Sequence, residues 1–329
     1  MLFKNKIILV TGGTGSWGHE LVRQLLTYHP KEIRIFSRNE SSQFAMKQEF
    51  DNNPALRFII GDIKEKEELI EACQDVEYIY HLAALKHVPV CEDQPIEALK
   101  TNVIGTQNVI NAAIACKVHK VIYISTDKAS DPSNFYGLSK AMGERLIIHA
   151  NTLNTKTRFV CIRGGNVLGT NGSVIHVFKR QIQEKQKVGI TDLNMTRFFI
   201  TCEEAIELVF KATFDSLGGE IFVLKMPACK IIDLAEVLIE ASNIENVGIE
   251  ILGVRPGEKI HELLLSAYES TTTVSYDEEY YVILPAIQIK GLKEHYSKYK
   301  SVNLENYNSS TGLMSKKEIK EMLLKGGFI

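Results

Sequence analysis

Residues 7–18 read Ile-Ile-Leu-Val-Thr-Gly-Gly-Thr-Gly-Ser-Trp-Gly, an apolar run that passes directly into a glycine-rich turn, and a helical pattern follows over residues 20–26. A strand, a glycine turn and a helix open a nucleotide-binding βαβ unit. There, Gly12 permits the tight turn, Gly15 lets backbone N–H groups approach a pyrophosphate, and Gly18 allows the helix to pack closely on the strand. A glycine triplet alone can be only a turn, but this context predicts a dinucleotide site at a helix N-terminus, where unpaired N–H groups favour an anion.

The composition limits the class of protein. The chain has 329 residues, 45% hydrophobic and 24% charged, with room for one large α/β domain and a smaller one. A formal net charge of -2 without basic blocks argues against nucleic acid as the main partner. The six cysteines form neither a CxxC pair nor a metal-ligand cluster, so we expect no metal and a reducing compartment. No apolar run approaches the roughly 20 residues that span a bilayer, and the first strand leaves no space for a signal peptide, so we expect a cytoplasmic protein without a transmembrane segment.

Short strands alternate with helical patterns along the first half of the chain. The expected strands are 32–36, 56–60, 76–80 and 121–124, and the expected helices are 65–73, 95–115 and 136–150. This alternation predicts an α/β fold, a Rossmann-type doubly wound parallel sheet, followed by a smaller C-terminal substrate-binding α/β domain. We place the dinucleotide-binding domain at residues 1–165 and the second domain at 166–329. In such a sheet, ligands gather at the carboxyl ends of the strands.

The end of the second strand bears on the choice between NADP and NAD. An acidic residue there binds the ribose hydroxyls, whereas an arginine accommodates a 2′-phosphate. This strand ends in Ser37-Arg38 without a carboxylate, which favours NADP(H) over NAD(H), although Arg38 could be only a solvated strand end. After the third strand, Asp62 and Ile63 are placed to reach the adenine, although an Asp that caps the next helix would explain Asp62 nearly as well.

Other residues near the strand ends are expected to contact the dinucleotide. Small residues, Ala83 and Ala84, let the backbone pass close to it. Lys86 lies on a loop that would border the nicotinamide. Asn102 is polar on an otherwise apolar helix face, and its alternative role is a buried hydrogen bond to nearby backbone. The remaining candidates come from the glycine turn: Thr14, Ser16 and Trp17.

Tyr136 and Lys140 are four residues apart on a predicted helix, so their side chains share one face. An ammonium beside a phenol favours the phenolate and would lower a pKa that starts near about 10. Tyr136 is therefore a candidate base for a substrate hydroxyl that loses its hydride to the nicotinamide. A tyrosine and a lysine at this spacing are common by chance, and the glycine turn and the Ser125-Thr126 strand end give the pair its weight.

Asp127-Lys128 places an acid and a base side by side at a strand end. Such a pair can be merely solvated loop residues. Here it follows Ser125-Thr126 and precedes Tyr136 by fewer than ten residues, at the mouth of the expected reaction centre. A second acid–base set suggests chemistry beyond alcohol oxidation, such as elimination of water or epimerisation next to a ketone.

These motifs together resemble a known family. Residues 10–18 with Tyr136 and Lys140 look like the extended short-chain dehydrogenase/reductase superfamily. Four further runs resemble the UDP-N-acetylglucosamine 4,6-dehydratase (5-epimerase) family, which includes the first enzyme of pseudaminic acid synthesis and enzymes of capsular sugar synthesis. These runs are Ser125–Ala129, Ala84–Pro89, Met195–Phe198 and Arg255–Lys259. The similarity extends to about Leu265; beyond it we expect only a strand at 280–284 and a helix at 315–325.

The resemblance implies an internal redox cycle on UDP-N-acetylglucosamine. Tyr136, aided by Lys140 and Thr126, would deprotonate the 4-hydroxyl as hydride passes from carbon 4 to a tightly held NAD(P). Lys128 would remove the proton on carbon 5, and Asp127 would protonate the departing 6-hydroxyl. Hydride would then return to carbon 6, and carbon 5 can be reprotonated from the opposite face.

The resemblance also assigns the second domain to the UDP-sugar. The matching positions are Lys86, Asn166, Ser173, Val174, Arg197, Arg255 and Glu258. Arginine suits a pyrophosphate because its planar fork donates two parallel hydrogen bonds, although Arg197 and Arg255 could form only surface ion pairs. Family members are commonly dimers or hexamers, so we expect a homo-oligomer.

The sequence also departs from the family pattern. Gly164 stands where the family normally has Tyr, Thr170-Asn171 replaces Ser-Arg, Trp17 replaces Phe, and Asn39 replaces Asp. A close alternative is therefore a partner enzyme that converts a dehydratase's 5,6-ene product to UDP-4-keto-6-deoxy-L-AltNAc. A non-catalytic dinucleotide-sensing regulator is a third reading, but it would be expected to lack Tyr136 or Lys140.

Overall fold

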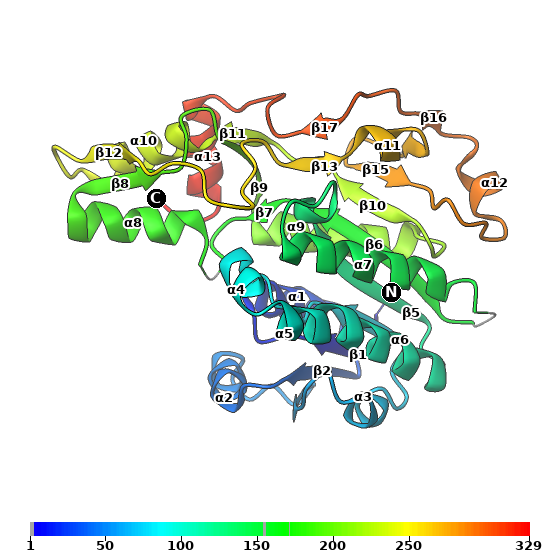
Figure 1. Cartoon of the computed structure of the whole chain (residues 1–329). Coiled ribbons are helices and arrows are strands. Elements are labelled where there is room, and N and C mark those ends of the chain that lie inside the picture. Colours follow the sequence, from blue (N-terminus) through cyan, green and yellow to red (C-terminus); the bar gives the residue numbers. More distant parts are fainter. Residues whose placement is uncertain (1–2, 154–155, 171) are drawn as a thin grey trace.

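The computed structural model describes residues 3–153, 156–170 and 172–329. Within these residues the main sheet has ten strands, in the order β16-β14-β15-β10-β6-β5-β4-β1-β2-β3 (Figure 1). The parallel strands are β3 (Leu56–Ile60), β2 (Glu32–Ser37), β1 (Ile7–Thr11), β4 (Tyr78–His81), β5 (Lys120–Thr126), β6 (Arg158–Gly164) and β10 (Ile221–Leu224). The antiparallel strands are β15 (Tyr280–Ile283), β14 (Thr273–Ser275) and β16 (Lys300–Ser301). The predicted doubly wound parallel sheet is confirmed.

The register of the sheet brings its strand ends together. Thr11 at the end of β1 pairs with Phe36 of β2 and with His81 of β4, and His81 pairs in turn with Tyr123 of β5. Because these strands run in parallel, the segments that follow them leave the sheet at one edge. His81 has a structural role, since its ring is buried and hydrogen-bonded to Thr11 and Thr106.

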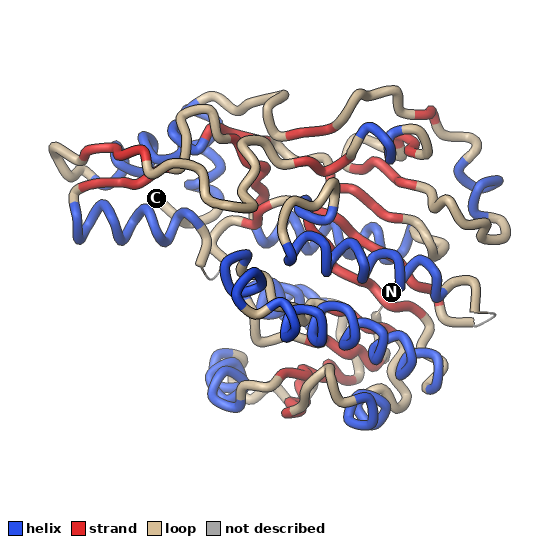
Figure 2. The backbone as a smooth tube through the Cα atoms, in the orientation of Figure 1, coloured by secondary structure: helices blue, strands red, loops and turns tan. Residues whose placement is uncertain are grey.

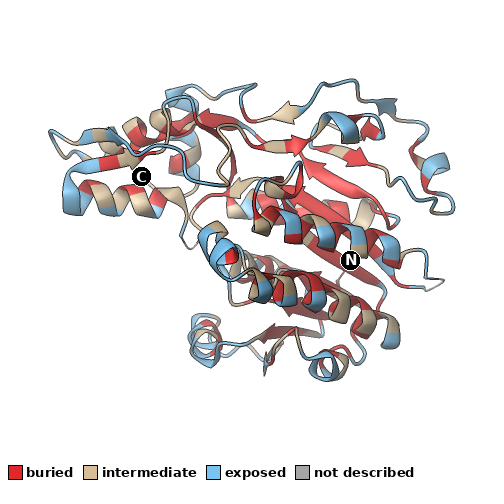
Figure 3. Ribbon diagram, in the orientation of Figure 1, coloured by how far each residue is buried: buried red, intermediate tan, exposed pale blue. Residues whose placement is uncertain are grey.

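Helices cover both faces of the main sheet (Figures 1 and 2). On one face, α1 (Ser16–Thr27) packs against α9 (Cys202–Asp215), and on the other, α6 (Gly105–Ala115) packs between α3 (Lys66–Ala72) and α7 (Phe135–Ala150). The strands between these layers are mostly buried, and all five residues of β1 are (Figure 3). The other helical segments of this half are α2 (Glu40–Glu49), α4 (Val88–Asp93), α5 (Pro95–Leu99), η1 (Lys100–Ile104) and the 3₁₀ turn η2 (Asp127–Ala129).

The C-terminal half adds a second packed unit beside the sheet (Figure 1). Its apolar cluster joins three helices: α8 (Val174–Lys185), α10 (Ile231–Ser242) and α13 (Lys316–Lys325). Its short strands form three small sheets: β7 (Asn166–Val167) with β9 (Thr196–Ile200) and β11 (Ala228–Lys230), β8 (Lys187–Ile190) with β12 (Gly248–Ile251), and β13 (Leu263–Leu265) with β17 (Tyr307–Asn308). The remaining helices are α11 (Ala267–Ser270) and α12 (Leu292–Tyr296). The expected boundary at residue 165 falls between β6 and β7, although β10 and β14–β16 return to the main sheet, so the division into two domains stays a prediction.

The helix expected over residues 95–115 contains a π-helical segment. It begins as α5, passes through η1 and continues as α6. A π-segment shifts the facing of the side chains by one residue and often occurs at functional sites. In η1 it buries Thr101 and Asn102. The sequence gives no sign of it, because the apolar spacing on either side is that of an ordinary α-helix.

A buried ion-pair network ties the N-terminal half to the C-terminal segment. Arg163 on β6 is 1% exposed and bonds Glu144 of α7 at 2.7 Å and Glu269 of α11 at 2.8 Å. Glu269 also accepts a hydrogen bond from Ser130, which directly follows η2. This network therefore fixes the turn after β5 to α11 through Ser130 and Glu269. Among the described residues, no helix combines the length and apolar character needed to cross a membrane.

Candidate functional site

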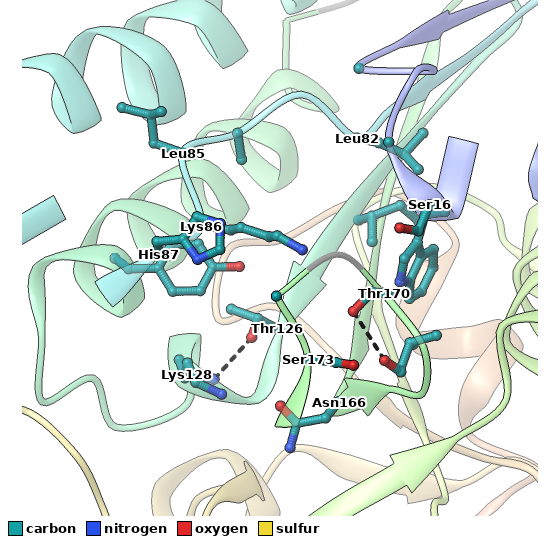
Figure 4. A pocket seen from close by; sticks show the side chains of 18 of the residues that line it. Ser16, Leu82, Leu85, Lys86, His87, Thr126, Lys128, Asn166, Thr170 and Ser173 are labelled. Atoms are coloured by element: carbon teal, nitrogen blue, oxygen red, sulfur yellow. Dashed lines mark hydrogen bonds between the residues drawn. The ribbon is translucent and has the colours of Figure 1, made fainter. Parts of the chain in front are cut away.

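A cavity of about 840 Å³ opens at the carboxyl ends of β1, β2, β4 and β5 and extends toward α8 and β9. It brings together most of the candidate residues. They are Gly12, Thr14, Gly15, Ser16, Trp17, Gly18, Ser37, Arg38, Asp62, Ile63, Ala83, Ala84, Lys86, Thr126, Lys128, Tyr136, Lys140, Asn166, Ser173, Val174, Arg197, Arg255 and Glu258. In Figure 4, Lys86 reaches into the cavity from the loop after β4, and Thr126, Lys128, Asn166 and Ser173 come from the other walls.

The glycine turn has the shape that a pyrophosphate requires. Gly12 has φ +71°, and a Cβ there would lie 2.8 Å from the Cα of Ala83. A Cβ on Gly18 would lie 2.0 Å from the Gly13 carbonyl oxygen, so this glycine allows the close packing of α1. Gly15 is the N-cap of α1 and offers no side chain to its first turn. These residues fit a dinucleotide, because an anion can take the place of the missing cap.

The adenosine side of the cavity combines a cation with a carboxylate. Arg38 is 56% exposed, and its Nη1 lies 3.9 Å from Asp62 Oδ2. The alternative that Asp62 is a helix cap is wrong, since α3 begins at Lys66 with Glu65 as its N-cap. Asp62 instead accepts a hydrogen bond from the Lys64 backbone. Asn39 also lines the cavity and caps α2 by accepting a hydrogen bond from the Ser42 backbone, so its replacement of Asp keeps a capping residue.

Asn102 is not part of the cavity wall that the structure describes. Its amide exchanges two hydrogen bonds with the Leu85 backbone, at 2.8 and 2.9 Å, and donates to Ser139. Asn102 therefore has the alternative role that we considered, a buried hydrogen bond to nearby backbone, and it holds the loop that carries Lys86. Its direct contact with a cofactor stays a prediction. Its neighbour Thr101 lines the cavity instead.

Tyr136 and Lys140 both face the cavity from α7, as their spacing predicts. The expected lowering of the pKa of Tyr136 is not found. Burial raises this pKa to about 12, against the opposing effects of Lys128 and a hydrogen bond to Thr126. Burial likewise lowers the pKa of Lys140 to about 7. The Lys140 ammonium donates a hydrogen bond to the Ile124 carbonyl at 2.7 Å. For both side chains, desolvation has a larger effect on the pKa than the other side chain has.

Lys128 has the opposite environment. Burial alone would lower its pKa, but the carboxylates of Asp127 and Glu262 raise it above the ordinary value. Their oxygens lie 3.0 and 3.4 Å from Lys128 Nζ. Asp127 is fully buried and does not line the cavity, whose wall at this point consists of Thr126 and Lys128. Thr126 Oγ1 donates to Asp127 Oδ1 at 2.8 Å and so connects this carboxylate to the cavity.

The C-terminal half supplies the remaining wall. Ser173 is the N-cap of α8, and its buried Oγ has no hydrogen-bond partner among the described residues. Arg197 is 12% exposed and lies 3.6 Å from Glu262, so the alternative of a surface ion pair does not hold for it. Arg255 stays exposed at the cavity rim. These groups surround the kind of space that an anionic substrate can occupy.

The departures from the family pattern lie in different places. Thr170 lines the cavity, whereas Asn171 lies outside the described residues. Gly164 does not line the cavity, so this replacement of Tyr is not on the described cavity wall. A Cβ on Gly164 would lie 3.1 Å from Leu224 on β10 and 3.8 Å from Met226, so this position packs inside the sheet.

Sequence reasoning missed several residues of the site. His87, Thr101, Ser125 and Thr191 line the cavity without having been assigned a role. Glu262 pairs with two cavity cations but was overlooked, because it lies beyond the Arg255–Lys259 motif. A carboxylate three residues after that motif, next to an apolar strand, was the available signal.

The family follows from comparison with known proteins. Residues 8–284 match the family model described as polysaccharide biosynthesis protein. The chain belongs to this family. It lies within the extended short-chain dehydrogenase/reductases and among nucleotide-sugar dehydratases and epimerases. A UDP-N-acetylglucosamine 4,6-dehydratase (inverting) from Campylobacter jejuni is 44% identical over 291 residues, which covers 87% of this chain and 85% of the relative.

Two further similarities extend over the whole length of this family member. A UDP-glucose 4-epimerase from Rickettsia bellii is 40% identical over 341 residues, covering 100% of this chain and 98% of the relative. The solved structure of Pen from Bacillus thuringiensis is 40% identical, covers 100% of both chains and has a TM-score of 0.93. The second similarity confirms the fold.

The glycine turn offers a matched pair of variants. A Cβ on Gly15 would meet only the Gly12 carbonyl oxygen, at 3.5 Å, whereas one on Gly18 would clash at 2.0 Å. We expect Gly15→Ala to change the free energy of unfolding by less than about 0.5 kcal/mol and to weaken the binding of a reduced nicotinamide dinucleotide at least about tenfold, since a methyl group then stands where the pyrophosphate approaches. Fluorescence titration with NADH and with NADPH, and urea unfolding, measure the two effects. Gly18→Ala should lose stability, and unchanged dinucleotide affinity in Gly15→Ala would contradict this assignment.

Lys140 should also leave a signature in the pH dependence of stability. Its pKa in the folded protein is about 7, below the ordinary value of 10.5 for a lysine, so the unfolded chain binds the extra proton between these two values. The free energy of unfolding therefore gains a positive slope with pH in this window, and none from Lys140 below pH 7. In Lys140→Met that slope should be smaller by about 1.4 kcal/mol per pH unit. Urea unfolding of both proteins without ligand, from pH 6 to 10, measures it; parallel curves would refute the shift.

Proposed function

We propose that this protein is a 4,6-dehydratase of a UDP-N-acetylhexosamine that works through a transient 4-ketone, with C5 epimerisation as a further outcome. The observation that carries the proposal is the presence of two acid–base sets in one cavity. Tyr136 and Lys140 form the first, and Lys128 and Thr126, with the carboxylate of Asp127 buried behind them, form the second. A reaction confined to carbon 4 needs only the first set.

The first set acts at carbon 4. A bound nicotinamide would accept hydride from carbon 4 and return it to carbon 6. Tyr136 takes the proton of the 4-hydroxyl; in the ligand-free site Lys128 and the hydrogen bond to Thr126 reduce, but do not cancel, the rise in its pKa caused by burial. Lys140 lies on the same helix face, and its ammonium favours the phenolate once the site is filled.

The second set acts at carbons 5 and 6. In the ligand-free site Lys128 is an ammonium, so it must lose a proton before it can act as a base. Transfer of this proton to Asp127, 3.0 Å away, creates the base and the acid in one step. Lys128 then removes the proton on carbon 5, and the Asp127 proton reaches the departing 6-hydroxyl through Thr126 Oγ1, which lies between Asp127 and the cavity. Both residues thereby regain their starting charges.

The UDP moiety would bind on the opposite wall. The N-terminus of α8 at Ser173-Val174, together with Arg197 and Arg255, offers donors and positive charge for a diphosphate. Lys86, Asn166 and Glu258 complete the set of polar side chains around the sugar and uridine. For the dinucleotide we propose NADP(H), with NAD(H) as the alternative, because β2 ends in Ser37-Arg38 without a carboxylate and Arg38 is exposed to the cavity.

The related partner-enzyme reaction remains a second candidate, favoured by the altered residue Thr170 on the cavity wall. It would use the same residues on the 5,6-ene product of a dehydratase, in pseudaminic acid synthesis. We further propose that the protein acts in the cytoplasm as a homo-oligomer, as is common in the family.

The direct test follows UDP-N-acetylglucosamine by NMR in deuterated water. We expect conversion to a 4-keto-6-deoxy sugar that carries deuterium at carbon 5. If the protein turns over only the 5,6-ene product of a dehydratase, supplied as a second substrate, the result would support the partner enzyme. A 4-epimer that keeps its C5 proton would support a 4-epimerase. Inertness toward both substrates with the dinucleotide bound would support a sensor. Each of these three results would contradict the dehydratase.

Two variants separate the acid–base sets. Tyr136→Phe should lower reduction of the bound nicotinamide by about 10²–10⁴-fold, because the 4-hydroxyl proton has no acceptor. Lys128→Ala should leave this reduction within a few-fold of wild type, while C5 deuterium exchange falls by about 10²–10⁴-fold. Absorbance at the reduced nicotinamide band and NMR report the two steps. Full C5 exchange in Lys128→Ala would show that another group is the base.

A further inference from the structure

We propose that Glu262 is a positioning residue that couples substrate binding at Arg197 to proton transfer at Lys128. The inference rests on the proposed function and deepens it, since it concerns how the same cavity is controlled. Glu262 itself does not line the cavity and would touch neither sugar nor dinucleotide.

The geometry places one carboxylate oxygen between two cavity cations. Glu262 Oε1 lies 3.4 Å from Lys128 Nζ and 3.6 Å from Arg197 Nε. The two cations come from different parts of the fold, Lys128 from the turn after β5 and Arg197 from β9. Glu262 is the carboxylate that both have in common, so it connects the catalytic strand end to the substrate-binding half.

Glu262 is held firmly in this place. Its side chain is 5% exposed, and its backbone N–H donates to Ser309 Oγ at 3.0 Å. The Ser309 N–H in turn donates to the Glu262 carbonyl at 2.9 Å. A carboxylate fixed from both sides of its backbone can impose a position on the long and flexible Lys128 side chain.

The second oxygen of Glu262 points to more than a packing role. Glu262 Oε2 is buried and has no hydrogen-bond partner among the described residues. Burying a carboxylate oxygen without a partner is costly, and a buried ion pair is by itself weak evidence for stabilisation. The site therefore keeps a negative charge beside Lys128 that stability alone does not require.

Four charged or titratable groups face Lys128. Asp127 is adjacent in sequence, Arg197 faces it from β9, Tyr136 from α7, and Glu262 from the segment before β13. A diphosphate that pairs with Arg197 draws the guanidinium away from Glu262. The Glu262 carboxylate then pairs mainly with the Lys128 ammonium. Substrate binding thus holds the Lys128 ammonium in place beside Glu262 until its proton moves to Asp127.

Removing the charge of Glu262 should change the proton step and spare the hydride step. In Glu262→Gln, Lys128 keeps only Asp127 as an anionic partner, so the rise of C5 deuterium exchange with pH should move to lower pH by about one unit, and the maximal exchange should fall about tenfold as Nζ is held less firmly. Reduction of the bound nicotinamide should stay within about twofold. The KM for UDP-N-acetylglucosamine should fall a few-fold, because Arg197 no longer shares its charge with Glu262.

Two companion variants complete the experiment. Glu262→Asp should restore the wild-type pH position in part, since it keeps the charge. Glu250→Gln removes an exposed carboxylate that pairs with Lys187 on the strand pair β8–β12, and it should behave as wild type. Urea unfolding of each variant shows whether the fold is retained.

The outcomes separate the two proposals. A Glu262→Gln profile that coincides with that of wild type overturns the inference, and so does an equal fall of hydride transfer and C5 exchange together with a lower unfolding midpoint. Wild-type protein that shows neither step with UDP-N-acetylglucosamine or a 5,6-ene substrate overturns the proposed function instead.

Discussion

Parallel pairing of β1 with β2 and β4, and of β4 with β5, is the constraint on which the site depends. It makes four strands end at one edge of the sheet, so that segments more than a hundred residues apart leave it together. The first segment becomes the glycine turn at the N-terminus of α1, and the last becomes the turn that holds Lys128. The ion-pair network of Arg163, Glu144 and Glu269 then holds that last turn in place through Ser130.

Two lysines twelve positions apart acquire opposite properties in one cavity. Lys140 is buried near a ring and a carbonyl group, and desolvation lowers its pKa to about 7. Lys128 is buried between Asp127 and Glu262, and these carboxylates raise its pKa. Groups whose surroundings separate their pKa values in this way can divide acid and base duties between them. In the reaction that we propose, this division lets one cavity act on carbon 4 and on carbon 5 of a sugar in different ways.

The sequence was sufficient for features that depend on local pattern. Three such features could be predicted: the glycine turn, the strand at Leu56–Ile60 and the helix that carries Tyr136. Each depends on the spacing of apolar residues or glycines that are close together in the sequence. Features set by long-range packing could not. The partners of Asn102, the burial that raises the pKa of Tyr136 and the position of Glu262 all depend on segments that meet only in the folded chain.

The central claim is that one sugar faces both acid–base sets at once. A crystal structure of the Tyr136→Phe variant with the dinucleotide and UDP-N-acetylglucosamine tests it most directly. We expect carbon 4 to face the nicotinamide and Lys128 Nζ to lie within about 3.5 Å of carbon 5, the separation of groups poised to react. A sugar whose carbon 5 faces away from Lys128, with another base beside it, would contradict the account.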